Sequence, residues 1–363
     1  TEIYTLSLHD ALPIYRGVEE HLLAVITISP KGGKRYRMPR DSDRDCIEQA
    51  KKIFETRKSI YEKNDILPTE NMSRHTVRPA KYLNKWVSLF NPRQLLLSAE
   101  LALSIKKIIQ EYHPKCPPFA PVIGTYLSFL LGKTINRNCR ITTWDRPGEK
   151  IMQACSNKLN AIQWDHSEIN PFTTVSGCFE YGFNDIKKAI TFSKEALNTE
   201  PIQVENRNVM EISQETIPNL KEKQFSLIIT DPPYYDDAPY AELSEFFFVW
   251  YQRILSGLYP NNPNFNSAVT PKEGDLSVSH LRTGVEFGEK FIFMCQKLNS
   301  LLKQNGMLVM FFAHPKVSNW YSVIRAFIEG NFHVTATWPV SKDSKGSANA
   351  KRKNYLLSSL III

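Results

Sequence analysis

A short apolar run followed by two prolines is the feature that most constrains this 363-residue chain. Leu227, Ile228 and Ile229 form a run typical of a buried strand, and Asp231-Pro-Pro-Tyr234 follows it almost directly. Two consecutive prolines lack backbone N–H groups, so the hydrogen-bond ladder of the strand has to end there. In open α/β sheets, ligands bind at the carboxyl ends of strands. We therefore predict that this tetrapeptide lies at a binding site.

The residue types in the tetrapeptide suit an exocyclic amino group on a nucleobase. Such a nitrogen is a poor nucleophile because its lone pair is delocalised into the ring, and acceptors that pull on its protons make it more reactive. Asp231 offers one acceptor, Pro232 and Pro233 stiffen the turn so that a neighbouring carbonyl faces the cleft, and Tyr234 offers a flat face for stacking. An ordinary strand-to-loop turn with two prolines is the alternative. The predicted catalytic residues are Asp231, Pro232, Pro233 and Tyr234, with Tyr235 and Tyr240 as substrate-binding residues.

Composition and charge fit a protein that binds nucleic acid. The formal net charge is +8 and the pI is about 9.0, although basic chains without such a partner are common. The hydrophobic content of 42% is enough for a sizeable core. Six scattered cysteines, without a Cys-x-x-Cys pair, argue against a zinc ribbon or a disulfide framework. No apolar run has the length of a membrane span, so we expect a cytoplasmic protein without a metal site.

The two ends of the chain indicate an internal fragment. Residues 1–14 contain Leu-His-Asp-Ala-Leu-Pro-Ile, which resembles the translation of a sequencing-library adapter, and we exclude them from fold prediction. Residues 356–363 end as an apolar strand without a polar tail. Residues 15–64 predict a basic hairpin and a helix over 41–56, capped by Ser42 or Asp43. The hairpin's cations could bind phosphates or form a solvated face; they are Lys31, Lys34, Arg35, Arg37 and Arg40.

Residues 65–200 read as a mainly helical region. Asn91 and Pro92 open the strongest helix, which runs to about residue 112, and further helices are expected over 126–131 and 186–196, the last capped by Asn184 or Asp185. The expected core positions of the strongest helix are Leu97, Leu101, Ile105 and Ile108. Two tryptophans, Trp144 and Trp164, are expected to be packing anchors. The cluster Asp165, His166 and Glu168 has no defensible metal-ligand spacing, and a surface loop is favoured there.

Residues 201–363 alternate between strand and helix patterns, which is typical of an α/β domain. Strands are expected over 209–212, 225–230, 307–313, 333–338 and 355–363. Helices are expected over 241–255, 287–302 and 320–329. The first of them should turn Leu243, Phe247, Trp250 and Ile254 inward, and Asn305-Gly306 should end the second.

The chain resembles the large prokaryotic adenine-specific DNA methylases. The Asp-Pro-Pro-Tyr tetrapeptide is similar to the signature of amino-group methyltransferases, and weaker patches agree with it in order and spacing over roughly residues 20–363. Those patches are Leu89–Leu95, Thr143–Gly148, Trp164–Asp165 with Asn170–Phe172, Thr230–Asp236, Phe248–Trp250, Phe312–His314 and Val334–Pro339. The resemblance implies part of a Rossmann-like class I methyltransferase sheet, preceded by a helical region. It also implies S-adenosylmethionine as cofactor, DNA as substrate and, as a further expectation, partner subunits of a defence or modification system.

One departure from the family concerns the cofactor. The family's Gly-rich turn after the first strand has no counterpart in this chain, and we expect it to lie upstream together with the first strands of the sheet. Ser213 and Glu215 are the residues predicted to contact the cofactor adenine. Adenine N6 in DNA is the favoured target, with Asp231 accepting from the amino group. Methylation of RNA or of cytosine N4, and a non-catalytic nucleic-acid-binding protein that kept the fold, remain the alternatives.

Overall fold

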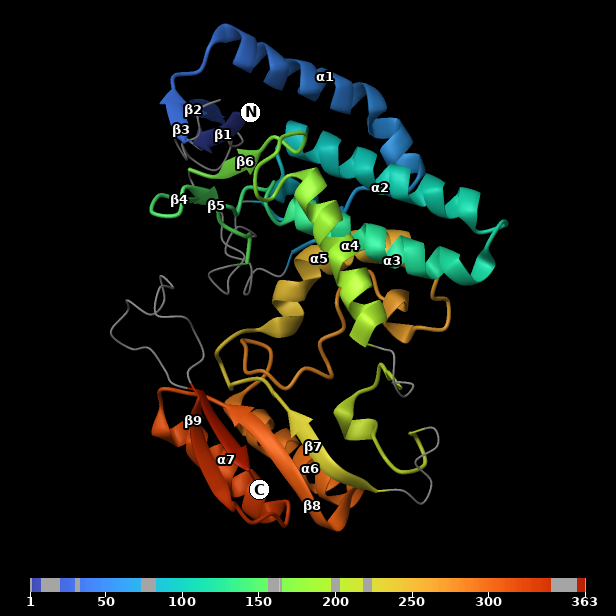
Figure 1. Ribbon diagram of the computed structural model, residues 1–363, viewed down its shortest axis with the longest axis vertical. Coiled ribbons are helices and arrows are strands. Elements are labelled where there is room, and N and C mark those ends of the chain that lie inside the picture. The colour runs from blue at the N-terminus through green and yellow to red at the C-terminus, as the bar shows by residue number, and fades with distance from the viewer. Residues whose placement is uncertain are drawn as a thin grey trace. The chain divides into compact units, whose positions relative to one another are not determined.

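The computed structural model describes residues 2–7, 20–29, 33–72, 83–155, 163, 165–196, 203–217, 224–340 and 358–362. The fold is mixed α/β, and the chain divides into two compact units (Figure 1). Unit 1 comprises Thr1–Ile202 and Ala241–Pro271, and unit 2 comprises Gln203–Tyr240 and Lys272–Ile363. The sequence pattern had placed all of 201–363 in one domain, whereas residues 241–271 pack with unit 1.

Unit 1 combines helices with small antiparallel sheets. The order of its main sheet is β3-β2-β1-β6 and that of the second sheet is β4-β5. Its strands are β1 Glu2–Ser7, β2 His21–Ile28, β3 Lys34–Arg37, β4 Trp144–Asp145, β5 Lys150–Ile151 and β6 Ser167–Ile169. Its helices are α1 Asp41–Lys63, α2 Pro92–Tyr112, α3 Ala120–Ile135, α4 Phe179–Ala196 and, from Ala241 on, α5 Tyr240–Leu255. Its short 3-10 helices are η2 Trp86–Leu89, η3 Pro117–Phe119 and η5 Pro263–Asn266.

The adapter-like segment contributes a strand to the main sheet of unit 1, which the sequence analysis does not predict. β1 pairs with β2 on one side and with β6 on the other, and Ile3 lies opposite both Ile26 and Ile169. The segment Glu-Ile-Tyr-Thr-Leu-Ser is rich in β-branched and aromatic residues that fit a pleated sheet. Residues 8–14 lie outside the described residues.

The predicted hairpin and first helix are present in unit 1. β2 and β3 pair with Val25 opposite Arg37, and α1 begins at Asp41 as predicted but extends to Lys63. Asp43 accepts from the backbone N–H of Arg40 at 2.7 Å, and Arg37 donates to its two carboxylate oxygens at 2.6 and 2.9 Å. The hydrogen bonds from Arg37 lower the pKa of Asp43 to about 2. Arg37 is therefore committed to this ion pair and is not a free phosphate ligand.

The strongest predicted helix has the predicted cap but a different buried face. Asn91 accepts from the backbone N–H of Gln94 at 2.9 Å, and Pro92 is the first helical residue. Of the four predicted core positions only Ile105 is buried, while Leu97, Leu101 and Ile108 are half-buried. The reason is that α2 packs against both α1 and α3, so it buries residues over a broader arc than one stripe. The buried residues are Gln94, Leu95, Ser98, Ala99, Ala102, Leu103, Ile105 and Ile109.

The core of unit 1 is rich in aromatic residues. Trp86, Phe246 and Trp250 are fully buried, and the rings of Phe90 and Phe246 stack with centroids 5.8 Å apart. Among the expected inward residues of α5, Trp250 and Ile254 are buried, whereas Leu243 and Phe247 are half-buried. The other α5 residues in the core include Glu245, whose carboxylate accepts from the Trp86 indole at 3.2 Å.

Several local predictions for residues 120–196 need correction. α3 is longer than residues 126–131, and α4 begins at Phe179, so Asn184 and Asp185 lie inside α4 and do not cap it. Glu168 is buried within β6 and His166 is buried immediately before it, so the two residues do not form a surface loop. Trp144 packs beside a small core of Ile26, Ile151, Ile169 and Cys178, as predicted for a packing anchor. Trp164 and Lys31 lie outside the described residues.

Unit 2 is built around a mixed sheet with the order β7-β8-β10-β9. β7 and β8 are parallel, and β10 runs antiparallel to both β8 and β9. The elements are β7 Phe225–Thr230, β8 Leu302–Phe312, β9 Ala336–Val340, β10 Ser358–Ile362, α6 Gly284–Leu301, α7 Val317–Glu329 and the 3-10 turn η4 Val209–Glu211. The core joins β8 to α6 and α7, and its fully buried residues include Phe287, Phe291, Leu308, Met310 and Phe327.

Three strand predictions for unit 2 are changed by the structure. Residues 209–212 hold η4 and not a strand, and β8 continues through Asn305 and Gly306 because the chain passes from α6 into the sheet at Leu302. The predicted strand over 333–338 is shifted to Ala336–Val340. β7 is less buried than its apolar sequence suggested: Leu227 is 48% exposed and Ile229 is 63% exposed, while Ile228 packs on the core. Alternate residues of a strand face opposite sides, and only one side of β7 meets the helices.

None of the helices in the part of the chain that the structure describes is long and apolar enough to cross a membrane.

Candidate functional site

The Asp-Pro-Pro-Tyr segment begins where the parallel pair of unit 2 ends. Thr230, the last residue of β7, lies opposite Met310 of β8, so the carboxyl ends of the two strands meet at one edge of the sheet. Asp231 follows at once and is exposed, whereas Pro232 is buried and Pro233 half-buried. The prolines anchor the turn while the carboxylate points into solvent. This is the position at which an α/β sheet presents polar groups to a ligand.

Tyr234 is a core residue that also orients Asp231. Only 6% of the residue is exposed, and its ring packs edge-on against Phe312 with centroids 5.6 Å apart. Its hydroxyl donates to Oδ1 of Asp231 at 2.6 Å. Burial raises the pKa of Tyr234, and the nearby Asp231 carboxylate raises it further, so the hydroxyl remains a donor at neutral pH. The sequence had suggested an open stacking face here, but the ring is already packed on Phe312.

Tyr235 and Tyr240 occupy contrasting environments on the same loop. Tyr235 has a φ of 60°, a strained value for a non-glycine residue, and its ring packs edge-on against Phe287 at 4.9 Å. Its hydroxyl lies so close to Gly284 that a Cβ there would be 2.0 Å from it. Tyr240 is 48% exposed at the start of α5. Tyr240 is therefore the open aromatic side chain of this loop, and Tyr235 is a structural one.

A histidine at the end of β8 holds the loop in place. Nδ1 of His314 lies 3.1 Å from the backbone N–H of Lys316, which can only donate, so Nε2 carries the proton of the neutral ring. Nε2 then donates to Oδ1 of Asp236 at 2.8 Å. The amide of Asn319 lies 3.1 Å from the ring nitrogens, and the Trp320 indole donates to the His314 carbonyl at 2.9 Å. We call His314, Asp236 and Asn319 the His314 clasp.

The clasp is not predicted by the sequence analysis, in which Phe312–His314 is named only as one of the patches that resemble the methylase family. A signal was nevertheless present. Asp231–Asp237 follows one parallel strand and His314 follows the next, and polar residues after neighbouring parallel strands lie at the same sheet edge.

The site is acidic. Asp231 and Asp237 both raise the pKa of Tyr240, after the larger effect of burial, and Asp275 adds to them. Asp275 also forms an ion pair with Arg282 at 3.1 Å. No group of three or more His, Cys, Asp or Glu side chains that could hold a metal ion occurs among the described residues. Such a surface favours cations and N–H donors and repels phosphate.

The residues predicted to bind the cofactor do not lie at this edge. Ser213 forms a turn with Thr216, whose hydroxyl accepts from the Ser213 N–H at 2.7 Å, and Glu215 is exposed on the same turn. The intervening Gln214 contacts the carbonyl of Ser300 at 3.5 Å, immediately before β8 begins. The turn therefore lies at the amino end of β8, whereas Asp231 lies at the carboxyl end of the parallel pair. The structure brings together Asp231, Tyr234, Tyr235 and Tyr240 but not Ser213 and Glu215.

Comparisons with protein-family models, with curated proteins and with solved structures found no match for this chain.

Proposed function

We propose that this chain is part of an S-adenosylmethionine-dependent methyltransferase that acts on the N6 amino group of adenine in DNA. The observation that carries the proposal is the exposed Asp231 carboxylate, which is oriented by the buried Tyr234 hydroxyl at the carboxyl end of a parallel strand pair. The alternation of β7, α6, β8, α7 and β9 in unit 2 supports a partial Rossmann-like sheet in this role.

In this proposal Asp231 accepts one proton of the adenine amino group. A carboxylate has about four lone-pair sites, and the Tyr234 hydroxyl uses one of them, so acceptor capacity remains. The fixed hydrogen bond restricts rotation of the carboxylate, which lowers the entropic cost of binding the amino group. The carbonyl beside Pro232 supplies the second acceptor. Together they draw electron density from the N–H bonds toward the amino nitrogen, where the lone pair must become available.

In this proposal the target base stacks on Tyr240, because the Tyr234 ring is already packed on Phe312. An adenine inside a duplex is inaccessible, so it has to be extruded into the site, and an aromatic face compensates part of the lost stacking. Tyr240 is half-exposed and near Asp231 and Asp237, whose charges affect its hydroxyl.

The methyl donor is implied by the family resemblance alone, and the residues described here do not fit it. Ser213 and Glu215 lie at the opposite end of the strands from Asp231, and no glycine of the described part of unit 2 has a positive φ of the kind that cradles a cofactor. When bound, S-adenosylmethionine would supply an electrophilic methyl group.

A substitution of Asp231 tests the proposal. With radiolabelled S-adenosylmethionine and adenine-containing DNA, we expect Asp231→Ala to reduce label transfer by about 10²–10⁴-fold, because an acceptor acting on the reacting group contributes that much. The same variant should keep most of its DNA affinity, which comes from phosphate contacts. Glu48→Ala, an exposed carboxylate on α1, is the matched control.

The same assay separates the alternatives. Label in RNA or on cytosine would move the proposal to those substrates, and transfer undiminished in Asp231→Ala would refute the assigned role. The misplaced Ser213 and Glu215 favour a second candidate, a nucleic-acid-binding protein without catalysis. For that candidate we expect tight DNA binding with no label transfer by the unsubstituted protein.

A further inference from the structure

Phosphate contacts have to come from a part of the molecule other than the acidic Asp231 site. Carboxylates at that site repel a polyanion, yet a DNA-modifying protein obtains most of its affinity from phosphates. Such contacts require a concave region of the surface lined by cations. Two adjoining hollows of unit 1 meet this description, and they share the wall residues Ser176 and Tyr181.

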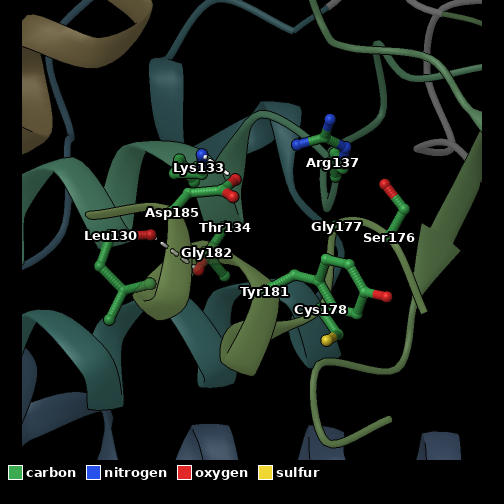
Figure 2. Close-up of a pocket in the computed structure, with 10 residues that line it drawn as sticks. All are labelled: Leu130, Lys133, Thr134, Arg137, Ser176, Gly177, Cys178, Tyr181, Gly182 and Asp185. Atoms are coloured by element: carbon green, nitrogen blue, oxygen red, sulfur yellow. Dashed lines mark hydrogen bonds and ion pairs between the residues drawn. The ribbon is translucent and has the colours of Figure 1, made fainter. Parts of the chain in front are cut away.

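The smaller hollow has a volume of about 40 Å³ and lies between α3 and the start of α4 (Figure 2). Figure 2 shows Lys133 on α3 and Arg137 just beyond the end of that helix, with Ser176 from the segment before α4 and Tyr181 from its first turn. Lys133 pairs with Asp185 at 2.8 Å, with both side chains substantially exposed. The larger hollow, of about 440 Å³, adds Lys34 and Lys150 as cations and Glu149 as a carboxylate.

Arg137 is the most informative residue of the smaller hollow. Its guanidinium has no hydrogen-bond or ion-pair partner within the part of the chain that the structure describes. Its aliphatic stem crosses Gly177, where a Cβ would lie 2.4 Å from the Arg137 Cδ, and Gly177 itself has a φ of 95°. The turn thus needs glycine both for its backbone conformation and for the close approach of Arg137. An arginine packed by its stem and free at its head is suited to bidentate recognition of phosphate.

The local field is positive despite the two carboxylates. The hydrogen bond from Lys133 lowers the pKa of Asp185, and the charges of Lys188 and Arg137 lower it as well. Tyr181, which is 49% exposed, offers an aromatic face between the cations. Cations interleaved with an exposed aromatic side chain are typical of nucleic-acid grooves.

We infer that the groove formed by Lys34, Lys133, Arg137, Lys150, Ser176 and Tyr181 binds the phosphate backbone of DNA. The choice of DNA as the polyanion rests on the proposed function, whereas the groove itself rests on its shape and charge. Lys133 would exchange Asp185 for a phosphate at small cost, because exposed ion pairs contribute little. Arg137 and Lys150 are available without breaking any ion pair in the described part of the chain.

Salt-dependent DNA binding tests this groove. Affinity of the whole chain for labelled duplex DNA is measured by fluorescence anisotropy over a series of salt concentrations. Each lost phosphate contact reduces the magnitude of the negative slope of log K against log salt by about 0.9. We expect Lys133→Gln/Arg137→Gln to reduce the magnitude of this slope by about 1.8, which corresponds to two phosphate contacts. Lys51→Gln/Lys58→Gln, which removes the same charge from exposed positions on α1, should change it much less.

A second variant guards against misfolding of the first. Ser176 is exposed, so Ser176→Glu places a carboxylate on the shared wall without disturbing the core, and it should weaken DNA binding and lower the slope. Equal slopes in the groove variants and the α1 control overturn the inference, as does binding of RNA alone or no DNA binding at all. These outcomes are separate from label transfer by Asp231→Ala, which retains the groove.

Discussion

At the scale of single residues, Asp231 and Tyr234 of the Asp231-Pro-Pro-Tyr234 segment have different roles. Asp231 is exposed and available to a ligand, while Tyr234 is buried and holds the carboxylate by a 2.6 Å hydrogen bond. The orientation of Asp231 therefore depends on core packing around Phe312. The next residue that matters is His314, which fixes the far end of the same loop through Asp236.

We expect His314→Ala to loosen the loop and His314→Gln to restore it in part. The glutamine amide can donate to Asp236 as Nε2 of His314 does, whereas alanine leaves the buried Asn319 without this partner. Loss of a buried hydrogen-bond partner costs about 1–3 kcal/mol, so the free energy of unfolding of unit 2 should fall by that amount in His314→Ala. Urea denaturation measures it.

The control for this prediction is His333→Ala, an exposed histidine of unit 2. In the label-transfer assay, a positioning role for His314 should appear as a lower kcat with little change in KM, recovered in His314→Gln. If His314→Ala and His333→Ala give the same stability and the same kinetics, the clasp has no role in positioning the loop.

At the scale of elements, Glu168 links β6 to the start of α2. Its carboxylate accepts from the side-chain amides of Asn91 and Gln94, each at 3.0 Å, and it forms an ion pair with Arg93. The residue is only 3% exposed. A carboxylate at a helix N-terminus is favourable because the first N–H groups and the helix dipole are positive there.

We expect Glu168→Ala to lower the free energy of unfolding of unit 1 by about 3 kcal/mol, because it removes the carboxylate from a half-buried ion pair with Arg93 and the acceptor of two buried amide donors. Glu168→Gln keeps one acceptor oxygen and should cost less. Chemical denaturation followed by tryptophan fluorescence gives the values. Glu111→Ala, at an exposed position near the end of α2, is the control, and similar stability of the two alanine variants would contradict the proposed link.

At the scale of the whole molecule, the two units should respond differently to acid. His166 of unit 1 is fully buried, and burial lowers its pKa to about 4. The charges around it partly offset one another: Glu20 and Asp165 raise the pKa, and Arg140 and Arg93 lower it. An unfolded histidine titrates near 6.5, so the unfolded state takes up a proton between pH 6.5 and 4 that the folded state does not. Stability therefore falls as the pH falls through this window.

We expect unit 1 to lose about 2.4 kcal/mol of stability between pH 7 and pH 4.5 through this residue, because the unfolded histidine titrates near 6.5 and the folded one near 4. His166→Gln should flatten that dependence, while unfolding of unit 2 is unaffected by the substitution. The window lies above the pKa of Asp43, which is about 2 and contributes at lower pH. Thermal melts across pH test this, with exposed His113→Gln as the control. A slope unchanged in His166→Gln would contradict a buried neutral histidine.

The sequence by itself determined the local elements and the candidate motif. The hairpin of β2 and β3, the Asn91 cap with Pro92, α5 and the strand before Asp231 all follow from patterns of neighbouring residues, which is where periodicity, capping and proline act. Those signals are local, so they also located the residues that form the exposed part of the site.

Only the tertiary structure decided which faces are buried and which residues meet. It placed residues 241–271 in unit 1, broadened the buried face of α2, gave the first residues a strand, and moved Ser213 and Glu215 to the other end of the sheet from Asp231. It also packed Tyr234 on Phe312 and joined His314 to Asp236. These outcomes depend on contacts between distant segments, and a pattern read along one segment carries no information about its partners.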